Sequence, residues 1–150
     1  NHFGMPGIDA TLRSYRESYV PSARFPEPKT LVPVNIVVAE NAEEASKLAL
    51  PQKLSNARLR SGGKMEPQPT VDEMENYSWA AREFMAPAPG PDSLFVGTPG
   101  DVAEGLTALA ARLGADEVMV SPVAGAYAGD DLERGARREE SLRLLAGELL

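Results

Sequence analysis

The segment that most constrains the fold is residues 30–39, which read Thr-Leu-Val-Pro-Val-Asn-Ile-Val-Val-Ala. Its apolar residues do not alternate with polar ones, as they would in a strand with one solvated face. The pattern predicts a strand buried on both faces, as in a parallel sheet covered by helices. Pro33 has no N–H to give to a sheet ladder, so we expect the strand to start or bulge near it.

Helices are predicted on both sides of this strand. Residues 8–20 carry apolar side chains three and four positions apart, which is the stripe of an amphipathic helix. A second helix is expected over 41–61, because Asn41 and Glu44 have the spacing of a capping box. Pro51 should kink or split this second helix.

The alternation of helix and strand continues in the second half of the chain. Residues 94–96 form a brief extended segment, and a well-capped helix is expected over 98–114. Residues 117–121 are a short strand, and Asp130 or Asp131 is expected to cap a last helix that runs to about residue 149. This order of elements predicts an α/β fold with parallel strands and right-handed crossovers.

Residues 64–92 differ in character from the rest of the chain. Prolines cluster at both ends of the segment, around a short helical stretch over 71–85. A connection of this length in a compact domain is usually a lid, a binding loop or disordered. Trp79 and Phe84 are candidate anchors over a ligand, although such residues more often fix a loop to the surface.

Composition excludes several classes of function. The net charge of −7 disfavours binding to the phosphate backbone of nucleic acids. With no cysteine and one histidine, the chain cannot form a disulfide framework, a thiolate metal site or a histidine-rich metal cluster. No apolar run approaches the roughly 20 residues of a membrane helix, and no signal-peptide pattern is present, so the cytoplasm is the default compartment.

The beginning of the sequence is unusual. It opens on the apolar, strand-like Asn1-His2-Phe3 and stops at Gly4, although a domain seldom begins on the last residues of a strand. Two full strands and one strand end also make too small a parallel sheet to be covered on both faces with protected edges. We therefore expect these residues to be part of something larger.

Several short stretches follow one another in an order that is more specific than any single stretch. They are His2-Phe3, Leu12-x-x-Tyr15-Arg16-Glu17, Pro21-Ser22, Val34-Asn35, Phe95-Val96-Gly97-Thr98-Pro99, Gly114 to Val120, Leu142-x-x-Leu145 and Glu148-Leu149-Leu150. In this order they resemble the carboxyl-terminal half of the bacterial luciferase-like, flavin-dependent monooxygenases. The resemblance runs over nearly the whole chain.

The resemblance implies a (β/α)8 TIM barrel, a fold of about 250 residues or more, of which residues 1–150 would be the carboxyl-terminal half. On that mapping, residues 1–3 end strand six, 30–39 are strand seven and 117–121 are strand eight, each with its helices. Residues 64–92 occupy the place of the family's mobile lid. The carboxyl ends of barrel strands face the active site.

The resemblance also implies a chemistry. The family uses reduced FMN, or in some members the deazaflavin F420, together with O2 and a small organic substrate, while the protein orients the flavin and excludes water. His2 is then the candidate catalytic residue, and Phe3, Ser121, Gly97 and Thr98 are candidate cofactor contacts, with no metal ligand implied. The structural alternatives stay open, namely strand ends for His2 and Ser121 and, favoured here, plain helix capping for Gly97 and Thr98.

A second function remains open. A degenerate relative would bind flavin or another ligand without catalysis, and a half-barrel would act as an interaction module whose edges are covered by another copy. The partners we expect are therefore a small-molecule substrate and O2 and, for the half-barrel, a second copy in a homodimer. Neither nucleic acid nor a membrane is expected.

Overall fold

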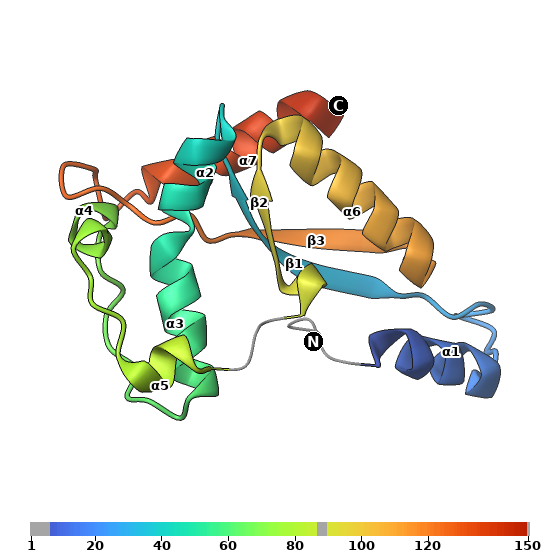
Figure 1. The fold of residues 1–150 in the computed structure, drawn as a ribbon. Coiled ribbons are helices and arrows are strands. Elements are labelled where there is room, and N and C mark those ends of the chain that lie inside the picture. Colours follow the sequence, from blue (N-terminus) through green and yellow to red (C-terminus); the bar gives the residue numbers. More distant parts are fainter. Residues whose placement is uncertain (1–6, 87–89, 150) are drawn as a thin grey trace.

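A three-stranded parallel sheet forms the centre of the chain in a computed structural model, which describes residues 7–86 and 90–149 (Figure 1). The strands are β1 (Leu31–Val38), β2 (Leu94–Gly97) and β3 (Glu117–Pro122). They lie in the order β2-β1-β3, so β1 is central and pairs with both neighbours. The predicted α/β fold with parallel strands is confirmed.

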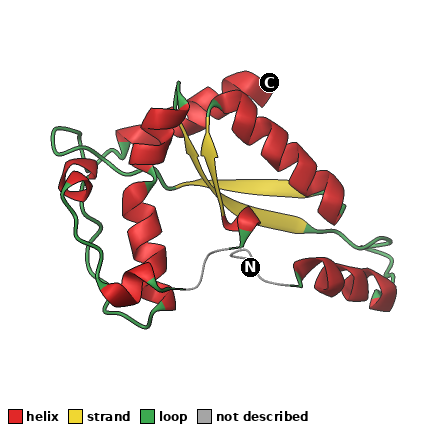
Figure 2. Cartoon of the chain, viewed as in Figure 1, coloured by secondary structure: helices red, strands yellow, loops and turns green. Residues whose placement is uncertain are grey.

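Helices pack around this sheet (Figure 2). Their bounds are α1 (Ile8–Ser18), α2 (Ala42–Leu48), α3 (Leu50–Arg60), α4 (Val71–Glu75), α5 (Ala81–Phe84), the 3-10 helix η1 (Pro91–Ser93), α6 (Pro99–Leu113) and α7 (Ala136–Leu149). None of the helices in the described ranges is both long and apolar enough to cross a bilayer.

One face of the sheet is covered by α6 and α7. The β1 residues on this face alternate along the strand, as the pleat requires. They pack against an apolar stripe on α6 and against leucines of α7, and the residues include Val32, Val34, Ile36, Val38, Val102, Leu106, Leu109, Leu113, Leu144 and Leu145. Val118 and Val120 of β3 lie against the same cluster.

The opposite face is covered only near its carboxyl end. There, Val37 and Ala39 pack against α2 and against Val71 of α4. Nearer the amino end, Leu31 of β1 is 51% exposed and Met119 of β3 is 53% exposed. The prediction that residues 30–39 are buried on both faces therefore holds at the end of the strand and is wrong at Leu31.

We call the uncovered part of this second face the open face. It consists of alternate residues of two neighbouring strands, which the register sets side by side as Leu31 with Glu117, Pro33 with Met119, and Asn35 with Ser121. Pro33 and Asn35 are half-buried, and the other four residues are exposed. A sheet of this kind is covered on one side and lacks a second layer over much of the other.

Helix boundaries follow local chemistry, with one clear correction. Pro51 splits the expected 41–61 helix, because α2 ends at Leu48 and α3 begins at Leu50. The last helix begins at Ala136 and not at Asp130 or Asp131, so that prediction is wrong.

Two features explain the later start of α7. Gly135 has a φ of 61°, a left-handed conformation that interrupts a right-handed helix. Asp131 closes a separate turn, since its carboxylate accepts hydrogen bonds from the N–H groups of Glu133 and Arg134.

Candidate functional site

The carboxyl ends of the three parallel strands meet at one edge of the sheet. Ala39 follows β1, Thr98 follows β2 and Val123 follows β3. Ligands of parallel α/β sheets and barrels bind at this edge, because the loops and helix starts that can reach them gather there. It is the natural place to look for a site.

Thr98 is occupied in capping α6. Its hydroxyl donates to the Asp101 carboxylate at 2.7 Å and accepts the Asp101 N–H at 3.3 Å, while the Thr98 N–H donates to the same carboxylate at 3.2 Å. The hydrogen bonds from the Thr98 hydroxyl and N–H lower the pKa of Asp101. Because the capping box uses both the hydroxyl and the N–H of Thr98, these groups are not free to bind a cofactor.

Gly97 is needed for packing at the end of β2. It is buried, and its carbonyl accepts the Ala39 N–H at 3.2 Å. A Cβ added at this position would lie 3.1 Å from the Cβ of Asp101, so the capping residue comes close because Gly97 has no side chain. The predictions for Gly97 and Thr98 as cofactor contacts remain untested.

Ser121 lies apart from Gly97 and Thr98. It is exposed on the open face, whereas Gly97 is the register partner of Val38, whose side chain faces α6 and α7. Because β1 separates β2 from β3, the structure does not bring Ser121 together with Gly97 and Thr98. His2 and Phe3 lie outside the described residues, and their predicted roles stay predictions.

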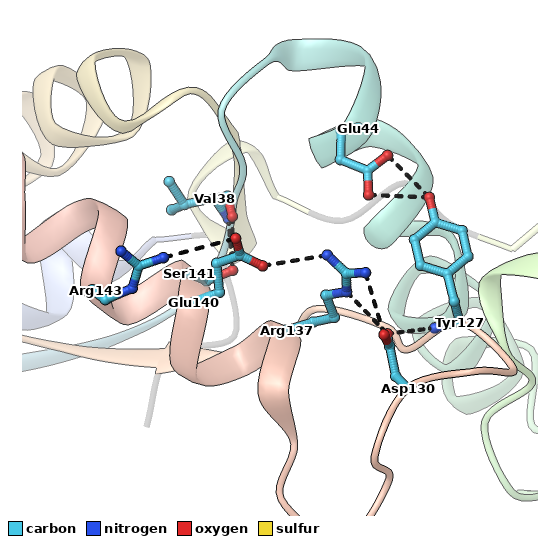
Figure 3. Close-up of polar contacts among 8 residues, drawn as sticks. All are labelled: Val38, Glu44, Tyr127, Asp130, Arg137, Glu140, Ser141 and Arg143. Atoms are coloured by element: carbon cyan, nitrogen blue, oxygen red, sulfur yellow. Dashed lines mark hydrogen bonds and ion pairs between the residues drawn. The ribbon is translucent and has the colours of Figure 1, made fainter.

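A polar cluster that the sequence did not reveal lies beside this edge (Figure 3). The Tyr127 hydroxyl donates to both carboxylate oxygens of Glu44 at 3.0 and 3.1 Å. Asp130 accepts two hydrogen bonds from Arg137, at 2.9 and 3.2 Å, and one from the Tyr127 N–H at 2.9 Å. The Arg137 guanidinium also lies 5.3 Å from the centre of the Tyr127 ring.

The pKa values in this cluster follow from its pairing. Burial raises the pKa of Tyr127, and the hydrogen bond to Glu44 raises it further. The hydrogen bonds from Arg137 lower the pKa of Asp130. Each group is satisfied by a neighbour, so the cluster fastens the loop after β3 to α2 and α7. On α7, Arg137 and Arg143 both form ion pairs with Glu140.

Ser141 completes the edge where β3 has ended. Its hydroxyl donates to the Val38 carbonyl oxygen at 2.9 Å and accepts the Val38 N–H at 3.2 Å. Both groups would otherwise have lost their strand partner, because the β1–β3 pairing stops at Ile36 and Pro122. A helix side chain thus replaces the missing strand, as Figure 3 shows.

Two small cavities flank the polar cluster. One of about 210 Å³ is lined by Thr70, Ala124, Ala126, Arg137 and Arg138 among others. The other, of about 120 Å³, is lined in part by Asn41, Glu44 and Arg137. Pockets for drug-sized ligands usually measure about 300–1,000 Å³, so neither cavity is large enough for a flavin.

The proline-rich segment, described over residues 64–86 and 90–92, is fastened to the rest of the fold through α4 and α5, among other contacts. Val71 and Met74 of α4 are buried, and the Val71 N–H donates to the Ala126 carbonyl. Further along, the buried Glu83 of α5 accepts from Arg58 of α3 at 3.1 Å. Pro87 and Pro89 lie outside the described residues.

The aromatic anchors of this segment differ in exposure. Trp79 packs edge-on against Tyr77, with ring centres 5.7 Å apart, and is 38% exposed. Phe84 is 80% exposed.

The pKa of the buried Glu83 carboxyl reflects its hydrogen bonds. Burial alone would raise this pKa, but hydrogen bonds from the Ala80 N–H, the Tyr77 hydroxyl and Arg58 lower it below its usual range.

The parallel sheet, with α6 and α7 on one face and a second face that α2 and α4 cover only in part, defines an α/β fold. Comparison with known proteins makes this specific. The chain is 27% identical over 121 residues to the "Luciferase-like monooxygenase" of Escherichia coli K12, which is 81% of this chain and 36% of the relative. The resemblance inferred from the sequence is confirmed by curated homologues of that name.

Other similarities extend this result. "Uncharacterized protein YceB" of Bacillus subtilis is 31% identical over 109 residues, or 73% of this chain and 33% of the relative. The crystal structure of apo-MsnO8 superposes with a TM-score of 0.72 and 26% identity, over 99% of this chain and 43% of that one. No family model matches the chain. The chain spans about a third of the length of the curated relatives it matches.

Proposed function

We propose that this chain is the carboxyl-terminal portion of a (β/α)8 barrel in a flavin-dependent monooxygenase that uses reduced flavin and O2 on a small organic substrate. The open face carries the proposal. In a barrel, helices cover the outer face of the strands and the inner face meets the other strands. The arrangement of α6 and α7 opposite the open face fits such a ring, and relatives about three times as long would supply the remainder.

A flavin would bind near the carboxyl ends of the strands. Ser121, close to the carboxyl end of β3, offers a polar group there, whereas Leu31, Pro33 and Met119 lie nearer the amino ends, where side chains of the other strands of a barrel would pack. When bound, the reduced flavin would supply the reaction with O2. The task of this chain would be to orient the ring and exclude water, and both FMN and the deazaflavin F420 are candidates.

Within this proposal, residues 64–92 form the lid and His2 contributes to the cavity. The Trp79 indole and the exposed Phe84 provide apolar surface for closing over a ligand. The exclusion of water from the reaction would then depend on this segment.

The open face also supports the second function, in which a non-catalytic half-barrel binds a second copy. An exposed sheet face with Leu31 and Met119 on it is a surface that another chain could cover. In that case the protein in solution would be a dimer, and the same face would not be free to bind flavin.

A titration of the full-length protein with FMN and with F420, followed by O2-consumption assays with the reduced cofactor, tests the proposal. We expect saturable binding of one of the two flavins and substrate-dependent oxidation. If neither flavin binds and scattering gives a dimer, the interaction module replaces the monooxygenase.

A further inference from the structure

The short helix α5 is held against α3 by a charge and not by apolar packing (Figure 1). Of its four residues, all of which the structure describes, Glu83 is the one that is buried, with a side chain that is 2% exposed. In the described part of the chain, α5 contributes no residue to the two buried apolar clusters. The neighbouring α4 differs, because Val71 and Met74 bury apolar side chains. A carboxylate is almost never fully buried unless it is paired.

Three groups satisfy the Glu83 carboxylate. Nε of Arg58 donates to one oxygen at 3.1 Å, and the other oxygen accepts from the Tyr77 hydroxyl at 2.8 Å and from the Ala80 N–H at 2.9 Å. Tyr77, Ala80 and Glu83 all belong to residues 77–86, which we call the strap. Among the described side chains, the hydrogen bonds that join the strap to α3 come from Arg58, to Glu83 and, at 3.2 Å, to the Tyr77 hydroxyl. The strap is therefore fastened to α3 through one guanidinium.

That guanidinium has a further partner outside the strap. A terminal nitrogen of Arg58 lies 3.1 Å from the carboxylate of Glu66, at the beginning of the proline-rich segment. The side chain of Glu66 is 52% exposed, whereas that of Arg58 is only 11% exposed. A cation as buried as Arg58 is costly to leave without a counter-charge. When Arg58 separates from Glu83, Glu66 stays within reach and supplies that charge.

Separating an ion pair differs physically from separating an apolar contact. Apolar surfaces that part are exposed to water, at a cost proportional to their area. Charges that part are hydrated again, which recovers much of the desolvation cost of having buried the pair. Segments with few buried apolar contacts are also those that open locally while the rest of the protein stays folded. The strap meets this condition, and α4 does not.

We infer that the strap undocks from α3 as one unit and that Arg58 is the catch that holds it. In the docked state the guanidinium binds Glu83 and Tyr77 as well as Glu66, and in the undocked state it keeps Glu66 alone. The bonds that Glu83 accepts from Tyr77 and Ala80 stay within the strap and move with it. This inference goes beyond the proposed function and needs no flavin. Under the proposed function, the strap is the part of the lid that moves.

Hydrogen exchange of the full-length protein, followed by mass spectrometry, tests this inference, with α4 as the internal reference. In the wild type, peptides that cover residues 80–86 should exchange at least about tenfold faster than peptides that cover 71–75. Glu83→Gln keeps the size of the side chain and removes its charge, which leaves Arg58 facing an uncharged group. It should speed the exchange of 80–86 by a further factor of about ten and leave that of 71–75 unchanged.

Glu66→Gln distinguishes a catch from an additional fastening. If Glu66 only helped to fasten the segment, its loss would speed the exchange of the strap. If Arg58 is a catch, its loss should slow that exchange by about two- to fivefold, because only the undocked state then leaves the guanidinium without a carboxylate. Glu75→Gln, at the exposed end of α4, is the matched control and should leave the exchange of the strap as it is.

Three results would each overturn the inference. They are equal exchange of the two segments in the wild type, unchanged exchange of 80–86 in Glu83→Gln, and faster exchange of 80–86 in Glu66→Gln. A variant that unfolds is recognised because residues 71–75 also lose protection, and the comparison within the wild type then decides. Since none of these measurements uses a flavin, a protein that binds no flavin and still shows the expected exchange refutes the proposed function and leaves the strap standing.

Discussion

Ser141 is a single side chain that holds α7 to the end of β1, and its removal should be costly. The side chain is fully buried, and its hydroxyl satisfies both the N–H and the carbonyl of Val38. Ser141→Ala would leave two buried backbone groups unpaired, at about 1–3 kcal/mol each. Part of this cost is offset because the hydroxyl itself no longer has to be desolvated. We therefore expect the free energy of unfolding to fall by about 2–4 kcal/mol.

Urea-induced unfolding of the intact protein, followed by circular dichroism, measures this change as a lower midpoint with an unaltered m-value. Ser55→Ala is the matched control, since Ser55 is also buried but its hydroxyl donates to the Pro51 carbonyl one turn back in its own helix and accepts only from the side chain of the exposed Gln68, which can turn to water. The control should lose less than about 1 kcal/mol. Equal losses in the two variants, or a loss below about 0.5 kcal/mol for Ser141→Ala, would refute the assignment of Ser141 as a substitute strand partner.

Three other perturbations have defined outcomes. Gly125→Ala would place a Cβ 2.7 Å from Cγ of Pro51 and 3.1 Å from the Leu48 carbonyl oxygen, so it should lower the melting temperature by disturbing the contact of this loop with α2 and α3. Asp116 has its pKa lowered to about 2, first by the hydrogen bond from Lys29. Since this carboxyl is more acidic when folded, it stabilises the protein above its unfolded pKa of about 3.9, and that contribution should disappear as the pH falls from about 4 to 2. Asp116→Asn should lack this acid-dependent step in pH-dependent melting curves. Thr98→Ala removes the N-cap of α6 and should cost about 1 kcal/mol in urea unfolding, without the larger loss expected of a core residue.

The fold could be predicted from the sequence wherever one local pattern determined the outcome. The strand over residues 31–38 and the capped start of α6 at Thr98 needed no knowledge of distant residues, and both are found as expected. The start of α7 was mispredicted because Asp130 and Asp131 carry a genuine capping chemistry that serves other bonds, to Arg137 and to a local turn. Several donors lie within a few residues of these aspartates, and the left-handed Gly135 delays the helix until Ala136.

The candidate site was harder to predict because its groups come from distant parts of the chain. Ser121 was identified from its place at a strand end, whereas its partner Asn35 lies 86 residues earlier in sequence numbering and becomes its neighbour only through the β1–β3 register. The contact between Tyr127 and Glu44 likewise spans 83 positions. Hydrophobic periodicity predicts where a strand lies, but it does not predict which residues of two distant strands become neighbours.

Burial constrains how a lid formed by residues 64–92 could move. Val71 and Met74 hold α4 in the core, and withdrawing a fully buried apolar side chain costs about 1.5–3 kcal/mol. The described contacts of α5 are different in kind, since its buried Glu83 reaches α3 through the ion pair with Arg58. Opening the whole segment would expose both the apolar contacts and the charge, whereas a hinge between α4 and α5 leaves the apolar contacts intact. If the segment closes over a flavin, the smaller movement, of α5 with Trp79 and Phe84, is the one that the packing favours.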